Sequence, residues 1–162
     1  MAVESVYLEP TIISYLTARN SRDLIVRGHQ RLTHKWWDQR FKYHLCISEL
    51  VLSEISRGDP GAAAKRLALV ENLTILPVTS EAKSLAAKYV CNISELSHAP
   101  GDALHISIAT VHELEYMLTW NCAHIANAHS RRSLELLNNS LGKRSTVICT
   151  PEELMDVQQA LD

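Results

Sequence analysis

The sequence lacks several features that define special classes of protein. No apolar run approaches the ~18–20 residues that a membrane-spanning helix needs, so a helical membrane protein is excluded. Basic residues are not in excess, because 16 Lys and Arg stand against 18 Asp and Glu. A uniformly basic coat for nucleic acid is therefore excluded, and any such partner must meet a local patch.

Cysteine is also sparse, and the four thiols do not form the pattern of a disulfide scaffold. They lie far apart over 162 residues, and none belongs to a CxxC pair. Free thiols in a reducing compartment are the simplest interpretation, so we expect a cytoplasmic protein. With 46% hydrophobic and 21% charged residues, the chain is expected to form one globular domain over residues 1–162.

Short strand-like segments alternate with longer segments of helical periodicity. Apolar runs rich in β-branched or aromatic residues predict strands at Ser5–Leu8, Tyr43–Ile47, Leu73–Val78, Tyr116–Trp120 and Thr146–Cys149. Helical spacing predicts helices over Ile12–Arg19, Ser21–Arg40, Glu49–Arg57, Gly61–Glu71, Glu81–Cys91, Asp102–Glu115, Ala126–Leu141 and Pro151–Ala160. Asp59 and Ser80 are the expected caps of two of them. The alternation predicts an α/β fold, a three-layer α/β/α sandwich around a central parallel sheet of four to five strands.

Two acidic residues stand where parallel sheets bind ligands, beyond the carboxyl ends of strands. Glu9 ends the first strand and precedes Pro10, so its carboxylate lies beside a helix start. An ordinary cap acid is the alternative interpretation. Asp102 opens a helix that is apolar over most of its circumference, and it is either a functional acid or an N-cap stabilised by the backbone dipole.

Two glutamates share the predicted helix Glu49–Arg57, and their spacing separates their roles. They are five positions apart and point to different faces. Glu49 suits the first turn, whereas Glu54 shares the apolar face with Leu50 and Val51. An acid on an apolar face needs a partner, which favours Glu54 as the functional residue, with a buried Lys or Arg pair as the alternative.

Asn121 follows the strand Tyr116–Trp120, where an asparagine is either a turn residue or an oxygen ligand. Three carboxylates and one amide would then gather at one sheet edge. Carboxylates repel one another unless a cation lies between them or some stay protonated. Hard oxygen ligands suit Mg²⁺ or Mn²⁺, which activate water and stabilise the oxygens of a phosphodiester. The constellation therefore predicts a metal-dependent nuclease.

Four segments occur in one order along the chain: YLEPTIISYL, SELVLSEISRGDPGAAAKRL, GDALHISIATVH and YMLTWNCAHIANA. In that order they resemble the PIN domain, specifically the VapC-like toxins of bacterial toxin–antitoxin pairs, and the late VICTPEEL continues the likeness. The resemblance implies Mg²⁺- or Mn²⁺-dependent RNA cleavage. It also implies a homodimer and a small antitoxin whose peptide enters the active groove.

The resemblance also assigns site residues, position by position. It places the four acidic positions of the family, which are the expected catalytic residues and metal ligands, on Glu9, Glu54, Asp102 and Asn121. Glu9 is one methylene longer than the usual Asp, and Asn121 removes a charge, so we expect weaker metal binding, down to one ion. Thr11 and Thr119 match hydroxyl positions beside the acids, where they either orient them or are ordinary strand-end threonines.

Candidate RNA-binding residues are cations on two predicted helices, namely Arg27, Arg31, Lys35, Arg131 and Arg132. Cations would bind phosphates, and the aromatics interleaved with the first three would stack on bases. Packing of Trp36 and Trp37 in the core or in a protein contact is the stronger interpretation, since adjacent tryptophans point different ways from a helix. A solvated helix face explains Arg131 and Arg132 equally well.

Two other functions fit the sequence. One is a catalytically weak or inactive PIN-fold module that binds RNA or an antitoxin. The other is a metal-independent ribonuclease that uses His124 or His44. His105, on the apolar helix, is expected to be a hydrogen-bonded core histidine rather than a zinc ligand, because no short paired spacing typical of structural zinc is present.

Overall fold

A five-stranded parallel sheet forms the centre of the computed structural model, which describes residues 2–156. The strands are β1 (Ser5–Leu8), β2 (His44–Ser48), β3 (Thr74–Leu76), β4 (Tyr116–Leu118) and β5 (Val147–Cys149), in the spatial order β3-β2-β1-β4-β5. All five predicted strands are confirmed, with ends that differ by one or two residues at most.

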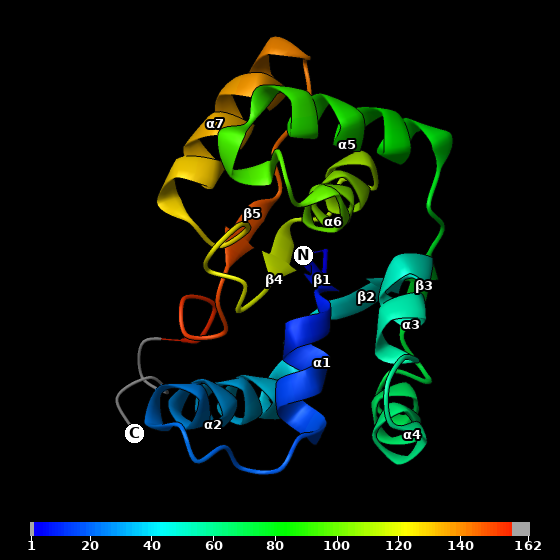
Figure 1. Cartoon of the computed structure of the whole chain (residues 1–162), viewed down its shortest axis with the longest axis vertical. Coiled ribbons are helices and arrows are strands. Elements are labelled where there is room, and N and C mark those ends of the chain that lie inside the picture. The colour runs from blue at the N-terminus through cyan, green and yellow to red at the C-terminus, as the bar shows by residue number, and fades with distance from the viewer. Residues whose placement is uncertain (1, 157–162) are drawn as a thin grey trace.

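Helices cover both faces of the sheet. They are α1 (Pro10–Thr17), α2 (Leu24–Asp38), α3 (Glu49–Ile55), α4 (Pro60–Leu69), α5 (Ser80–Asn92), α6 (Pro100–Val111) and α7 (Ala128–Ser140), with the 3-10 turns η1 (Arg40–Lys42) and η2 (Ser94–Leu96). Figure 1 shows α5, α6 and α7 grouped on one side of the sheet and α1 to α4 on the other. The predicted α/β/α sandwich is therefore confirmed.

The strand order reverses between β1 and β4, at the centre of the sheet. From β1 the chain moves to β2 and then β3 on one side, and it returns through α5 and α6 to β4 on the other. Leu8 of β1 and Leu118 of β4 are partners in the parallel register. The residues that follow them, Glu9 and Thr119, therefore emerge side by side at the carboxyl edge of the sheet, where open α/β sheets bind ligands.

Side-chain caps set several helix starts differently from the prediction. α2 begins at Leu24 rather than Ser21, because the Asp23 carboxylate accepts the amides of Ile25 and Val26. Thr79, not Ser80, caps α5 by accepting the Ala82 amide at 3.1 Å. The predicted cap Asp59 is confirmed and accepts the Ala62 amide at 2.9 Å.

The predicted helix Pro151–Ala160 is wrong over its described part. Residues 151–154 form a turn and Met155 a bend, and the part of the predicted helix after Asp156 lies outside the described residues. The Glu153 carboxylate folds back to accept the Thr150 amide at 2.8 Å, and the Thr150 carbonyl accepts the Leu154 amide. The Thr150 hydroxyl also accepts the Glu153 amide at 3.4 Å, so the two residues form a capping box, the usual contact pair of a helix start, although only one turn follows it in the described residues.

The structure also bears on two further expectations, that no helix spans a membrane and that the cysteines are free thiols. Within residues 2–156, no helix is both long enough and apolar enough to cross a bilayer. The four cysteines are free thiols, of which Cys46 and Cys149 are buried.

Candidate active site

Glu9 lies at the reversal point and is only 5% exposed. Its Oε2 accepts hydrogen bonds from the Thr11 amide at 2.9 Å, from the Thr119 hydroxyl at 3.0 Å and from the Thr11 hydroxyl. Burial raises the pKa of the Glu9 carboxyl, and the hydrogen bonds from the two threonines oppose that rise. Glu9 is thus both the N-cap of α1 and a buried acid at the sheet edge.

The two threonine hydroxyls also accept backbone hydrogen bonds from the segment after β4. The Trp120 amide donates to the Thr11 hydroxyl at 2.9 Å, and the Asn121 amide donates to the Thr119 hydroxyl at 2.9 Å. Each hydroxyl proton is therefore directed to Glu9. No described residue donates a hydrogen bond to the other oxygen of Glu9, Oε1.

Glu54 on α3 points toward α6. Its side chain is 30% exposed, and its Oε2 contacts the His105 Nε2 at 2.8 Å, so its partner is an imidazole rather than a Lys or Arg. Its Oε1 lies toward the start of α6, 3.9 Å from the place a Cβ on Gly101 would take. Glu49, one turn earlier, is exposed and accepts the Val78 amide at 3.0 Å. The two glutamates do face different surroundings.

His105 connects Glu54 to the centre of the sheet. It is 1% exposed, and its Nδ1 lies 2.6 Å from the hydroxyl of Tyr7 on β1. That hydroxyl also lies 2.8 Å from the Ser48 hydroxyl at the end of β2. Burial raises the pKa of Tyr7 far above its usual range, so this hydroxyl stays protonated. Tyr7 and Ser48 escaped the sequence reasoning, although a tyrosine in a central strand needs a partner for its hydroxyl.

Asp102 and Asn121 stand on different elements. Asp102 is half-buried in the first turn of α6, three positions before His105, and Ala99 is the N-cap of that helix. No described residue donates a hydrogen bond to its carboxylate. Asn121 stands in a turn, where its Oδ1 accepts the His124 amide at 3.1 Å and its carbonyl accepts the Ala126 amide at 2.8 Å.

The donor types of these residues suit a hard divalent cation, but they are not gathered as a finished cluster. Within the described range, no three His, Cys, Asp or Glu side chains are close enough together to hold a metal ion. Glu9 and Glu54 nevertheless share one property. In each, the Oε2 atom has a hydrogen-bond partner among the described residues and the Oε1 atom has none. Metal-binding carboxylates are commonly oriented in this way. The residues therefore fit Mg²⁺ or Mn²⁺ by their chemistry.

This chain is similar to known proteins in its three-dimensional structure. No protein-family model and no curated protein matches the chain. VapC20 of Mycobacterium tuberculosis, a Sarcin-Ricin loop cleaving toxin, aligns with a TM-score of 0.55 and 14% identity, over 69% of this chain and 86% of its own. The fold of this chain is similar to that of VapC20. VapBC2 from Rickettsia felis, bound to a DNA fragment from their promoter, aligns with a TM-score of 0.56 and 14% identity over 90% and 98% of the two chains.

On this VapC-like fold, the candidate RNA-binding cations fall into two groups. Arg27, Arg31 and Lys35 are exposed at successive turns of α2. The two cations of α7 pair with acidic residues instead. The Arg131 Nη1 lies 3.3 Å from the Glu153 Oε1, and the Arg132 Nη1 lies 4.0 Å from the Glu135 Oε2. The α2 group is therefore the better candidate for phosphate contacts.

The aromatic residues near the α2 cations have separate environments. Trp36 is completely buried, as expected for one of two adjacent tryptophans. Phe41 is 81% exposed, and the Arg40 guanidinium lies over its ring and over that of Trp37. Phe41 is thus available for stacking, whereas Trp36 belongs to the core.

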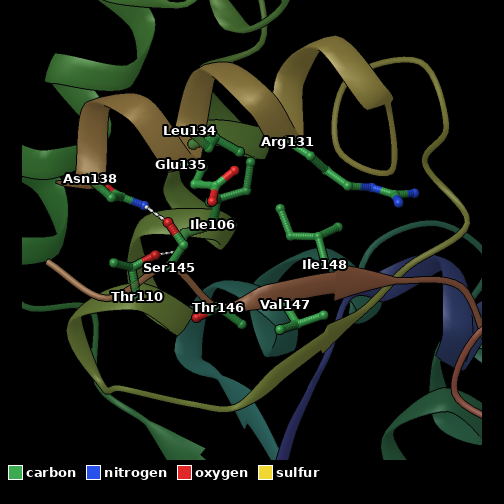
Figure 2. A pocket seen from close by; sticks show the side chains of 10 residues that line it. All are labelled: Ile106, Thr110, Arg131, Leu134, Glu135, Asn138, Ser145, Thr146, Val147 and Ile148. Atoms are coloured by element: carbon green, nitrogen blue, oxygen red, sulfur yellow. Dashed lines mark hydrogen bonds between the residues drawn. The ribbon is translucent and has the colours of Figure 1, made fainter.

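A pocket of about 330 Å³ lies elsewhere in the VapC-like fold, between α6, α7 and β5. Figure 2 shows its lining residues, with the Arg131 guanidinium extending away from the other labelled side chains. None of the four predicted ligands lines this pocket. It is therefore separate from the carboxylate edge formed around Glu9 and Glu54.

Proposed function

We propose that the chain is a divalent-metal-dependent endoribonuclease and the toxin of a toxin–antitoxin pair. The observation that supports the proposal is the hydrogen bonding of two acids, Glu9 after β1 and Glu54 on α3. In each, described residues donate to Oε2 and none donates to Oε1. Glu9 lies at the reversal of strand order, the usual ligand position in open α/β sheets. The VapC-like fold is consistent with it.

In this proposal, Mg²⁺ or Mn²⁺ is held by Glu9, Glu54, Asp102 and Asn121. When bound, such an ion activates water for attack on a phosphodiester and neutralises its oxygens. Thr11 and Thr119 hold the Glu9 carboxylate in place, and His105 holds Glu54. Loop or single-stranded RNA is the proposed substrate, because an open backbone enters an acid-lined groove more readily than a duplex. VapC20, of the same fold, is described as cleaving the Sarcin-Ricin loop.

The remaining parts of the proposal concern partners and location. We propose a small cognate antitoxin whose peptide enters the groove, a homodimer, and a cytoplasmic setting. The likeness to VapBC2 supports the antitoxin, and the free thiols agree with a reducing compartment.

The test is a cleavage assay with purified chain, free of any antitoxin, on a labelled Sarcin-Ricin loop hairpin. We expect cleavage with Mn²⁺, none with EDTA, and none from Asp102→Asn. Asp59→Asn, which changes an exposed helix cap, should cleave like the wild type. Full activity of Asp102→Asn with metal still required rejects the assignment. Cleavage that persists in EDTA points instead to the histidine mechanism, with His124 or His44.

A second candidate is a module of the same fold that binds RNA or an antitoxin without cleaving. It is favoured by the absence of a ready three-ligand cluster in residues 2–156 and by the amide of Asn121 in place of a fourth carboxylate. It predicts a gel shift of the hairpin by the chain, with no cleavage at any Mn²⁺ concentration. Cleavage that depends on metal excludes it.

A further inference from the structure

We infer that Tyr7 and His105 are positioning residues for Glu54 and fix the direction of its carboxylate at the sheet edge. The inference rests on the proposed function, because Glu54 is one of the proposed metal ligands. It concerns a continuous hydrogen-bond network that runs from β2 through β1 and α6 to α3. The network consists of Ser48, Tyr7, His105 and Glu54.

When Glu54 is ionised and His105 is neutral, the hydrogen bonds of this network have only one possible direction. A carboxylate accepts but does not donate, so the proton at 2.8 Å belongs to His105 Nε2. In a neutral imidazole, Nδ1 is then an acceptor, and the Tyr7 hydroxyl must donate to it over 2.6 Å. The Tyr7 oxygen accepts in turn from the Ser48 hydroxyl. Tyr7 therefore selects the tautomer that presents a donor to Glu54.

Burial makes this hydrogen-bond network rigid up to Glu54, its last residue. Tyr7 and Ser48 are 0% exposed and His105 is 1% exposed, whereas the Glu54 side chain is 30% exposed. Three ordered groups thus hold one carboxylate that reaches solvent. His105 occupies Oε2, and Oε1 lies toward the start of α6, where Asp102 stands. Outer groups of this kind change metal affinity by about 10–100-fold when they are removed.

Tyr7→Phe tests the inference because it removes only the hydroxyl. Its matched control is Tyr89→Phe, since Tyr89 is also 0% exposed and its hydroxyl donates to Asn138 at 2.7 Å, remote from α3. Mn²⁺ binding is measured by electron paramagnetic resonance, and the His105 tautomer by ¹⁵N nuclear magnetic resonance. We expect Tyr7→Phe to weaken Mn²⁺ binding about tenfold and to give a mixture of tautomers. Tyr89→Phe should keep the wild-type affinity.

A pair of substitutions at His105 separates positioning from packing. His105→Gln places an amide donor near the Nε2 position and should bind Mn²⁺ more tightly than His105→Leu, which has none. If the wild type cleaves with Mn²⁺ while Tyr7→Phe and His105→Leu bind Mn²⁺ as it does, the inference is overturned and the proposed function stands. If the wild type neither binds Mn²⁺ nor cleaves, both are overturned.

Discussion

The Thr119 hydroxyl donates to Glu9 Oε2 over 3.0 Å, across the gap between the carboxyl ends of β1 and β4. These residues directly follow Leu8 and Leu118, which are partners in the parallel register. The bond therefore joins the two halves of the sheet where the strand order reverses. It also holds a carboxylate that burial alone would disfavour in its charged form.

Removal of this hydroxyl should affect stability. Thr119→Val keeps the shape of the side chain but deprives the Glu9 carboxylate of a donor and the Asn121 amide of an acceptor. We expect a loss of about 1–3 kcal/mol in the free energy of unfolding, measured by urea denaturation. Thr119→Ser restores the hydroxyl and should recover most of it. Equal stability of the valine and serine variants would show that the bond contributes nothing.

A change at Asn121 should strengthen metal binding. Asn121→Asp keeps an oxygen that accepts the His124 amide and adds a negative charge at the sheet edge. We expect the Mn²⁺ concentration for half-maximal cleavage to fall about tenfold, because cation affinity rises with ligand charge. Asn127→Asp adds the same charge at another cap, where the side chain accepts the His129 amide, and should leave that concentration unchanged. An equal effect of both would indicate a general effect of net charge.

The cations of α2 should contribute to RNA affinity through phosphates. Replacement of Arg27, Arg31 and Lys35 together by Ala should weaken binding and lower the slope of log affinity against log salt by about 2, as expected for three contacts with single-stranded RNA. The control is Lys83→Ala with Lys88→Ala, two exposed cations on α5. Filter binding over a range of salt concentrations measures both. An unchanged slope in the triple variant would remove α2 from the RNA-binding surface.

The Glu115 carboxyl should make the free energy of unfolding depend on pH. Hydrogen bonds from the hydroxyl and amide of Ser5 lower the pKa of the Glu115 carboxyl. A lowered folded-state pKa stabilises the protein above the ordinary pKa of Glu, and this stability is lost as the pH falls through the folded value. Ser5→Ala should therefore cost about 1 kcal/mol or less near pH 7, and less near pH 3. A difference that does not change with pH would contradict this account.

Local patterns were sufficient to predict the strands and the different surroundings of Glu49 and Glu54. Strand runs and helical faces repeat over a few residues, so a single sequence carries them. The partner of Glu54 was not predictable in the same way, because His105 is 51 positions away and reaches it only through the fold. The bond between Tyr7 and His105 spans 98 positions. The sequence supports His105 as a buried histidine, but not what it contacts.

Helix ends were less predictable for a local reason. Several polar residues near each start are able to cap it, and the one that does depends on the backbone path into the helix. Asp23 caps α2, so this helix begins three residues after the predicted start at Ser21, and α5 is capped by Thr79 rather than by Ser80. After β5, Thr150 and Glu153 form the capping box of a helix start, yet residues 151–154 make only a turn.

The central position of β1 has a consequence for biosynthesis. β1 is flanked by β2 and β4, and β4 begins only at Tyr116. Pairing between such distant segments is slow to form and follows synthesis of most of the polypeptide. A nascent chain that stops before Tyr116 holds Glu9 without Thr119 beside it. Premature termination should therefore yield fragments that lack the proposed site.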